Sequence, residues 1–432
     1  MKKMIFLMAA WCCLSMYAQK KWTLDECINY AMENNVSMKL AKLQKQSAQE
    51  DVEQSKAALF PTLTASTNQG VGYSPWDNTK ADKAYYNGSY NVNAQWTVWN
   101  GGQNTNAVKL DKLTAEQTVL SANETGNSIQ EQITKLYIQI LYLTEAIEVN
   151  RQSLETSKKN EERGQQMVEV GKMSKADLAQ LTAQRASSEY NIVESETQLA
   201  RYKMQLKQVL ELKDEKEFDI AIPSTTDQQA LADIPSLNSV YEDALTHRPE
   251  IKNAKLDIEA SNLQLKIAKA GKLPTVTLNG GVSTSTSSLS SLAWGTQMKN
   301  GFGVTASVGV SVPIFDGRRA KTSINKAILA QEQAQVRYNN EQIDLYATIE
   351  GYWLDAVNNQ QKFRSAKASV DSEQASYDLL QEQFNLGLKN IVELMTGKDK
   401  LLKAQQSMLQ SKYTTILNQQ LLRFYQGETM NI

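Results

Sequence analysis

The chain has 432 residues and a formal net charge of −1, with only 20 glycines and 7 prolines. Its length allows two or three ordinary domains, and the scarcity of Gly and Pro favours long helices. The near-neutral charge excludes the basic face that nucleic-acid-binding proteins need, so we expect no nucleic acid among its partners. The sequence has one histidine, no nucleotide-binding loop and no clustered reactive residues. We therefore expect that the protein is not an enzyme and has no catalytic residues, no metal site and no cofactor.

The beginning of the chain, residues 1–18, is typical of a secretory signal peptide. Two lysines follow the initial methionine, an apolar stretch too short to span a membrane comes next, and Ala18 supplies the small residue before the cleavage point. The alternative is a lipoprotein signal that uses Cys12 or Cys13. Either signal would export the protein from the cytoplasm.

Residues 19–213 are expected to form a first structural repeat. A helical segment from Leu24 to Ala58 leads into two stretches, about 62–73 and 90–99, in which apolar and polar residues alternate. Alternation with a period of two, together with β-branched residues, predicts strands. The two strands are expected to form a hairpin with a long polar connection.

A long helical hairpin is expected to follow, at about 103–212. Between Gln103 and Glu162 there is no proline, and apolar residues recur at alternating spacings of three and four, which indicates a coiled-coil seam. Two glycines interrupt this pattern, so the sequence predicts the tip of the hairpin between Gly164 and Lys175.

The second half of the chain repeats this order behind a connection at 214–236. The second repeat, 237–432, is expected to hold strands at about 275–284 and 303–313 and a helical hairpin at about 318–425. The offset between the halves is nearly constant, since Leu237 follows Leu24 by 213 residues and Gly387 follows Gly171 by 216. This offset indicates two copies of one structural unit.

The four strands have the length and patterning of membrane-spanning β-strands. Nine to eleven tilted residues cross a bilayer, and the polar positions of these strands carry Asn, Gln, Ser and Thr in place of charges. Four strands cannot close a barrel, and an open edge in lipid would leave backbone groups unpaired. Two chains would give eight strands and a filled interior, whereas three would give twelve and an open lumen. A soluble sandwich with one solvated face is the alternative.

The order helix, strand pair, long helical hairpin, repeated twice, resembles the TolC-like outer membrane efflux protein family, the outer membrane factors. The resemblance covers essentially the whole chain after the signal peptide. Short motifs at duplicated spacing support it: Ala58-Leu59-Phe60-Pro61 and Lys272-Leu273-Pro274 before the strands, Trp99-Asn100-Gly101 and Phe315-Asp316-Gly317 after them, Arg248-Pro249-Glu250 in the second repeat, and the glycine turns Val170-Gly171 and Leu386-Gly387.

The resemblance implies a mainly α fold with a β-barrel portion. Three chains would form a twelve-stranded barrel in the outer membrane and an α-helical barrel in the periplasm. The implied partners are outer-membrane lipid, two further copies in a homotrimer, a periplasmic adaptor (membrane fusion) protein and a proton-driven or ATP-driven pump of the inner membrane. The implied function is a passive exit duct.

The same resemblance places candidate gating residues at the periplasmic tips of the hairpins. These candidates are Gly171, Asp177, Phe384, Gly387, Lys389 and Glu393. Three copies of an acidic side chain around an axis would attract cations, but the two carboxylates are equally expected to cap their helices. Some family members carry a second acidic residue nine positions after the glycine, where this chain has Gln180 and Thr396.

Three functions are compatible with the sequence. The first is the exit duct of a tripartite efflux system, and the second is the exit duct of type I protein secretion. The third is a soluble periplasmic coiled-coil scaffold, which does not account for the strands at equivalent points of both repeats. The sequence does not indicate the substrate, since a wide wet duct need not recognise its cargo.

Overall fold

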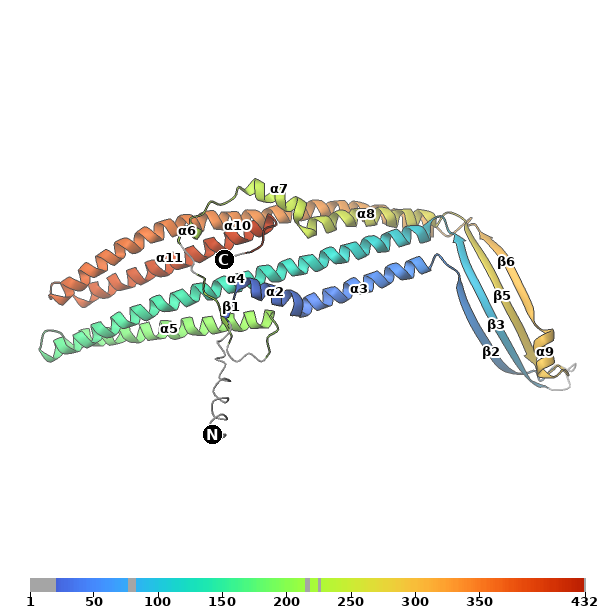
Figure 1. Ribbon diagram of the computed structural model, residues 1–432, viewed down its shortest axis with the longest axis horizontal. Coiled ribbons are helices and arrows are strands. Elements are labelled where there is room, and N and C mark those ends of the chain that lie inside the picture. Colours follow the sequence, from blue (N-terminus) through green and yellow to red (C-terminus); the bar gives the residue numbers. More distant parts are fainter. Residues whose placement is uncertain (1–20, 77–82, 214–217, 224–226, 431–432) are drawn as a thin grey trace, which may run out of the picture. The chain divides into compact units, whose positions relative to one another are not determined.

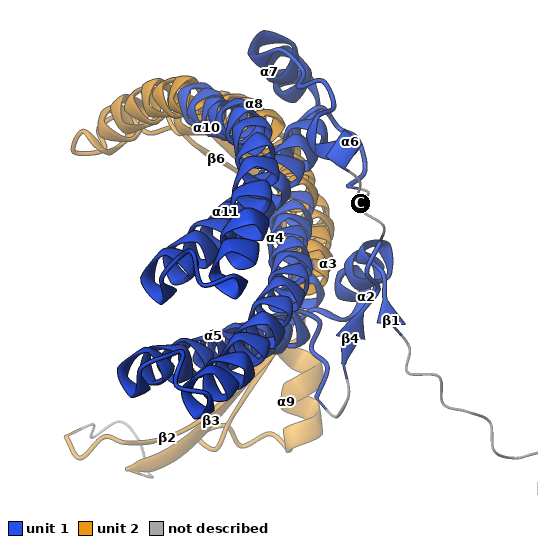
Figure 2. Cartoon of the chain, turned by 90° about the vertical axis from the view of Figure 1, so that its left-hand side faces the viewer, with its two compact units in different colours: residues 1–41, 122–249, 342–432 blue, residues 42–121, 250–341 orange. Residues whose placement is uncertain are grey.

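The computed structural model describes residues 21–76, 83–213, 218–223 and 227–430. The expected signal peptide therefore lies outside the described residues. The chain divides into two compact units, of which unit 1 comprises residues 1–41, 122–249 and 342–432, and unit 2 comprises residues 42–121 and 250–341 (Figure 2). Along the described residues, no helix is both long and apolar enough to cross a membrane.

Each repeat has two helices, a pair of long strands and a pair of long helices in the same order (Figure 1). The first has β1 (Lys21–Trp22), α2 (Leu24–Asn34), α3 (Val36–Ala57), β2 (Thr62–Tyr73), β3 (Ala84–Trp99), α4 (Gln103–Glu169) and α5 (Lys175–Val209). The connection holds β4 (Asp219–Ile220) and α6 (Asp227–Ala230). The second repeat has α7 (Leu237–His247), α8 (Pro249–Ala270), β5 (Thr275–Ser287), α9 (Trp294–Asn300), β6 (Gly303–Ser311), α10 (Arg319–Asn385) and α11 (Ile391–Tyr425). Within the described residues, β1 in the first repeat and α9 in the second have no counterpart.

The helical segment expected from Leu24 to Ala58 is broken into α2 and α3, and the second repeat has a break at the equivalent position. In the first repeat Asn35 adopts an extended conformation, and its side-chain oxygen accepts a hydrogen bond from the N–H of Ser37 at 2.8 Å, so it caps α3. In the second repeat Arg248, 213 residues later, precedes Pro249, which disfavours helical geometry at Arg248 and then starts α8.

The expectation that Gly164 lies in the first hairpin tip is wrong. The helix α4 continues through Gly164 to Glu169, and the turn occupies residues 170–174. A Cβ atom at Gly164 would lie 2.5 Å from Cδ1 of Leu181 on α5. The glycine therefore permits close packing of the two helices, and it does not end α4.

The four long strands form one antiparallel sheet in the order β2-β3-β5-β6, which lies in unit 2. The strand β3 begins at Ala84, earlier than expected, because Ala84–Ser89 continues the pairing with β2 up to Tyr73. The outer strands β2 and β6 pair on one side only within the described residues. The sheet therefore has two open edges.

The register separates two faces of different polarity. Val92 pairs with Ala65 on one side and Val282 on the other, and Leu278 pairs with Trp96 and Val308, so these side chains share an apolar face. The alternate positions carry amides, hydroxyls and glycines, as in the paired residues Asn93 and Gly281. None of the four strands contains Asp, Glu, Lys or Arg.

A β-bulge near the end of β3 adds a second tryptophan to the apolar face. Thr97 and Trp99 pair with the neighbouring residues Thr277 and Val276, so Val98 is an extra residue in β3. Without the bulge Trp99 would lie on the polar face. The indole N–H of Trp96 donates to the carbonyl oxygen of Leu59 at 2.8 Å and fixes the ring beside the strand.

The connection between the repeats is held in unit 1 by side chains spaced seven residues apart on two helices. The amide of Gln360 donates to the carbonyl oxygens of Ala230 and Ala232 at 3.0 and 2.8 Å. The residues involved are Trp353, Gln360 and Lys367 on α10, and Lys412 and Gln419 on α11. A spacing of seven keeps them on one face of each helix, so both helices anchor the connection.

A buried lysine joins the two helical hairpins. Lys398 on α11 is 5% exposed, and its ammonium group donates to the carbonyl oxygen of Ser153 at 2.8 Å and to the hydroxyl of Ser157, both on α4. Ser157 also bonds to Ser188 on α5 at 2.9 Å. Burial lowers the pKa of Lys398 to about 8, with Asp399 opposing the shift.

The first prediction concerns the connection. Gln360→Ala should lower the free energy of unfolding by about 1–2 kcal/mol, because it leaves the carbonyl oxygen of the buried Ala230 without this donor, and that of Ala232 with Gln419 alone. Limited proteolysis should then cut the connection faster, and thermal unfolding should begin earlier. The neighbouring Gln361 is exposed, so Gln361→Ala is the matched control and should behave as wild type. Equal behaviour of the two variants would contradict the anchoring role.

The second prediction concerns Lys398. Its folded pKa of about 8 lies below the value of about 10.4 for an unfolded lysine, so the folded state binds fewer protons between these values. Stability should therefore rise as pH increases from 8 to 10. Lys398→Met should abolish this rise, because methionine does not titrate. Thermal unfolding across this pH range measures the effect, and Lys400→Met, at an exposed position, should retain the rise.

Candidate functional site at the hairpin tips

Both hairpin tips turn through a glycine in the left-handed conformation. Gly171 has φ +70° and Gly387 has φ +74°. Lys172 N–H donates to the Met167 carbonyl oxygen at 2.7 Å, and Gly171 N–H donates to that of Val168 at 3.0 Å. The second tip has the same pair of bonds. This is a Schellman motif, which ends α4 and α10 and requires a residue that tolerates positive φ.

Three residues after each glycine a side chain caps the next helix. The N–H of Asp177 donates to the hydroxyl of Ser174 at 3.0 Å, and that hydroxyl donates to the Asp177 carboxylate at 2.8 Å. In the second tip Glu393 and Asn390 form a complete capping box. Both candidate carboxylates therefore stabilise the first turn of a helix. The sequence shows the signal for these caps, a capping residue three positions before a carboxylate, although the capping prediction rested on the helix dipole.

The two tips differ in the charge around the carboxylate. In the second tip the ammonium group of Lys389 lies 2.7 Å from the Glu393 carboxylate. This hydrogen bond, followed by the N–H of Asn390, lowers the pKa of Glu393. The position equivalent to Lys389 in the first tip, 216 residues earlier, is Met173, whose side chain packs against apolar residues. Asp177 therefore lacks the lysine that neutralises its counterpart.

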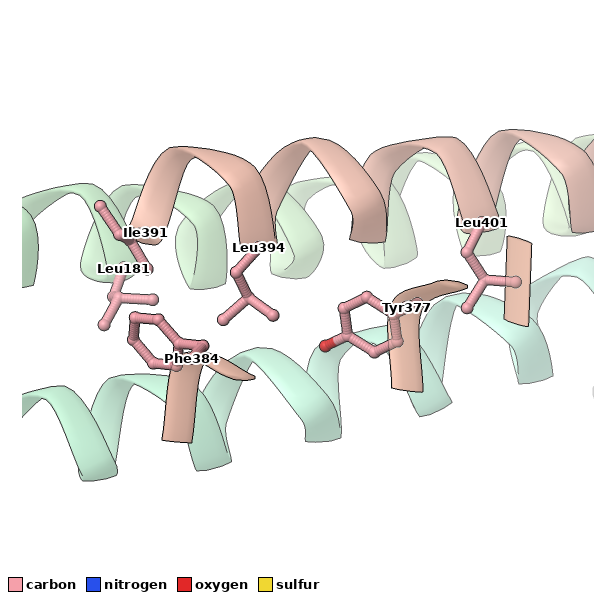
Figure 3. Packing of buried hydrophobic residues seen from close by; sticks show 6 residues of the cluster. All are labelled: Leu181, Tyr377, Phe384, Ile391, Leu394 and Leu401. Atoms are coloured by element: carbon pink, nitrogen blue, oxygen red, sulfur yellow. The ribbon is translucent and has the colours of Figure 1, made fainter. Parts of the chain in front are cut away.

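Phe384 lies in a hydrophobic cluster that joins the two tips (Figure 3). Its side chain is 3% exposed and points toward Leu181 of α5 and Ile391 of α11. The other buried members are Tyr377, Leu394 and Leu401, and Met173 and Met395 pack against the cluster. Residues from both repeats thus share one core. The sequence shows the apolar spacing of each helix but not which helices meet.

In each hairpin the two helices approach closely where a glycine on one helix faces a leucine on the other. The glycine lies on the first helix in one hairpin and on the second helix in the other. In the first hairpin Gly164 of α4 faces Leu181 of α5, as described above. In the second hairpin Leu380 of α10 faces Gly397 of α11, where a Cβ atom would lie 2.6 Å from Cδ1 of Leu380. Leu380 is equivalent to Gly164 and Gly397 to Leu181, at the same offset of 216 residues. Each hairpin therefore keeps one small and one large residue at this level.

The tips expose apolar side chains next to charged ones such as Lys172 and Lys175. Four large apolar side chains on or beside the turns are more than half exposed: Val170, Leu386, Leu388 and Val392. Two of them, Val170 and Leu386, occupy equivalent positions in the two repeats. A patch of this kind on a turn favours contact with another protein surface. The sequence prediction did not include this patch, whose only signal in the sequence is the apolar residues beside each turn glycine.

The residues at the tips shape the turns and form a surface that another protein can contact. The candidate residues act there as turn formers, helix caps, an ion pair and a core residue. Within the described residues, no group of three or more His, Cys, Asp or Glu side chains is arranged to hold a metal ion. The carboxylate of Asp177, half-buried and without an ion pair in the described part of the chain, is the candidate group with unneutralised charge.

Comparison with known proteins relates this fold to a family of channels. The family model described as outer membrane efflux protein matches residues 27–211 and again residues 240–428. Outer membrane protein TolC of Vibrio cholerae is 23% identical over 406 residues, covering 91% of this chain and 88% of TolC. Toxin and drug export protein A of Aggregatibacter actinomycetemcomitans is 21% identical over 398 residues, covering 91% of this chain and 83% of that protein.

A solved structure shares the fold over nearly the whole chain. The outer membrane protein VceC of Vibrio cholerae superposes with a TM-score of 0.79 at 17% sequence identity, covering 94% of this chain and 97% of VceC. The family model covers both repeats, including the strands and the tips described above. The chain therefore belongs to the outer membrane efflux protein family and is a TolC-like transport channel of the outer membrane.

Proposed function

We propose that this chain is one third of a homotrimeric exit duct in a tripartite efflux system. The observation that supports it best is the sheet in unit 2, which has one apolar face, one uncharged polar face and two open edges. In lipid each unpaired backbone group costs several kcal/mol, so β2 and β6 need partners. Pairing β6 of one copy with β2 of the next would satisfy both edges and close a twelve-stranded barrel.

The polarity of the two faces supports a water-filled lumen. The apolar face, with Val92, Leu278 and Val308, would contact lipid, and the face with Asn93 and Thr305 would line the pore. Hydroxyls and amides wet a pore without binding ions strongly. Such a wall would pass cargo of different kinds and requires neither a cofactor nor a reaction.

The tips support contact with partners in the periplasm. The apolar side chains of Val170, Leu386 and Leu388 offer a surface to a periplasmic adaptor protein, which would connect the duct to an inner-membrane pump. Three copies of Asp177 around the axis would form an acidic ring at the entrance, and the buried Phe384 would hold the tips together until the partners dock.

Type I protein secretion is the second candidate function, since a duct of the same construction would serve an ATP-driven exporter. The relative named as a toxin and drug export protein has a name that covers both kinds of cargo. A neighbouring gene for a proton-driven pump would favour efflux, and one for an ATP-driven exporter with a substrate protein would favour secretion. The soluble scaffold is disfavoured, because the family lies in the outer membrane.

The third prediction uses adjacent residues on opposite faces of β6. Val308 is on the apolar face and Ser307 on the polar face. Val308→Lys should place a charge in lipid at a cost of about 2–4 kcal/mol and reduce the amount of assembled trimer in the outer membrane. Ser307→Lys should assemble normally and shift the pore toward anions. Cross-linking of membrane fractions and bilayer conductance measure the two effects. Equal assembly of both variants would contradict a lipid-facing apolar side.

The fourth prediction separates gating from helix capping at the tips. Glu393→Gln and Asp177→Asn keep the hydrogen-bonding side chains of the caps but remove their charges. If the carboxylates form an acidic entrance, both variants should lower the preference for cations in a planar bilayer. We expect the larger change for Asp177→Asn, because Lys389 already neutralises Glu393. Unchanged ion selectivity in both variants would leave capping as the sole role of these residues.

A further inference from the structure

The connection between β5 and β6 folds back onto the apolar face of the sheet. Thr284 pairs with Tyr90, two residues along from Val92, so both side chains lie on that face. The hydroxyl of Thr284 donates to the carbonyl oxygen of Met298 in α9 at 2.8 Å. The ring of Trp294, at the start of α9, meets the ring of Tyr90 edge-on at 6.3 Å. The short helix α9 therefore covers the end of the apolar face, beside β5 (Figure 1).

This position is fixed by specific hydrogen bonds. The side-chain oxygen of Gln297 accepts from the N–H of Ser287 at 2.7 Å, and its nitrogen donates to the carbonyl oxygen of Leu292 at 2.7 Å. One side chain thus ties α9 both to the end of β5 and to the preceding turn. These hydrogen bonds hold the connection in a fixed position against the sheet.

The connection exposes four large apolar side chains, which lie among serines and other uncharged polar residues. Leu289, Leu292, Trp294 and Phe302 are 40, 47, 57 and 60% exposed. Between residues 288 and 302 the only charged side chain is Lys299. Phe302 also forms one wall of a hollow on the sheet, whose other lining residues include Ala65, Val92 and Val282. Thr67, Tyr90 and Thr284 also line the hollow, so the apolar face meets α9 and Phe302 through the aromatic rings of Tyr90 and Phe302.

We propose that this connection, residues 288–302, is a membrane-surface anchor that rests in the outer-membrane lipid. This inference rests on the proposed function, in which the apolar face of the sheet contacts lipid. We assign lipid as the partner of this surface, because the surface adjoins the lipid-facing side of the sheet and carries one positive and no negative charge. Tryptophan and phenylalanine favour the boundary between headgroups and acyl chains, and the hollow beside Phe302 suits an acyl chain. The anchor would limit the depth and tilt of the sheet.

The fifth prediction tests the anchor by tryptophan fluorescence in vesicles of brominated phospholipid, which quenches indoles that contact acyl chains. The full chain and its Trp294→Phe, Trp96→Phe and Trp353→Phe variants are compared, so that each difference isolates one tryptophan. The brominated lipid should quench most of the fluorescence of Trp294 and most of the fluorescence of Trp96. Trp353, on α10 in the periplasmic hairpin and hydrogen-bonded to Pro235, should keep its emission. Aqueous iodide should quench Trp294 weakly.

The outcomes distinguish the anchor from the duct. Quenching of Trp96 by brominated lipid without quenching of Trp294 would overturn the anchor and leave the proposed function intact. Absence of lipid quenching for both residues would contradict the placement of the sheet in lipid and therefore both proposals. If Trp294→Phe impairs assembly, Leu292→Trp added to the wild-type chain provides a second probe on the same surface, and it should add lipid-quenched emission.

Discussion

The hydrogen-bonding capacity of two strands, β2 and β6, is the constraint on which the rest of the structure depends. Each has one side paired within the sheet and the other open in the described part of the chain. In water an open edge is tolerable, but beside lipid its backbone groups have no other donors or acceptors. The apolar face and the absence of charged residues from the strands are suited to lipid, so the same sequence that favours the membrane makes a single chain insufficient. In the proposed barrel, each repeat would supply one strand pair and one helical hairpin to a wall that several copies complete.

The two tips have the same backbone structure but differ in the charge beside the cap carboxylate. Glycine turns, caps and the cluster around Phe384 give the two tips the same backbone and a common core. Within this shared frame, Lys389 neutralises the carboxylate of the second tip, whereas Met173 at the equivalent place in the first tip adds to the core. The repeats therefore diverged in side chains that decide charge and packing, while they kept the residues that set the turn. Of the two cap carboxylates of each chain, an entrance built from such tips would present one, Asp177, without a neutralising lysine.

The two repeats also differ in the residues at which their helices approach each other. They differ again in the side chains that anchor the connection between the repeats. The glycine and leucine of a close contact exchange helices between the hairpins, which preserves the total volume at that level. The connection is anchored from both repeats at equivalent positions. Tyr137 donates to the carbonyl oxygen of Ala221 at 2.5 Å, and Trp353, 216 residues later, donates to that of Pro235 at 3.2 Å. The duplicated helices thus hold successive parts of one connecting segment, and this joins the two repeats within unit 1.

The sequence by itself determined the type and order of the main elements, because their signals are local: alternation for the strands, spacings of three and four for the helices, and glycines that interrupt the helical pattern for the tips. It also determined the two polarities of the sheet, since these follow from the strand period of two. Only the tertiary structure decided that Gly164 lies inside α4, that Phe384 and Leu181 share a core, that Lys398 is buried between hairpins and that α9 lies on the apolar face. These features depend on contacts between residues far apart in the chain. A single sequence shows which side chains can be buried but not which neighbour buries them.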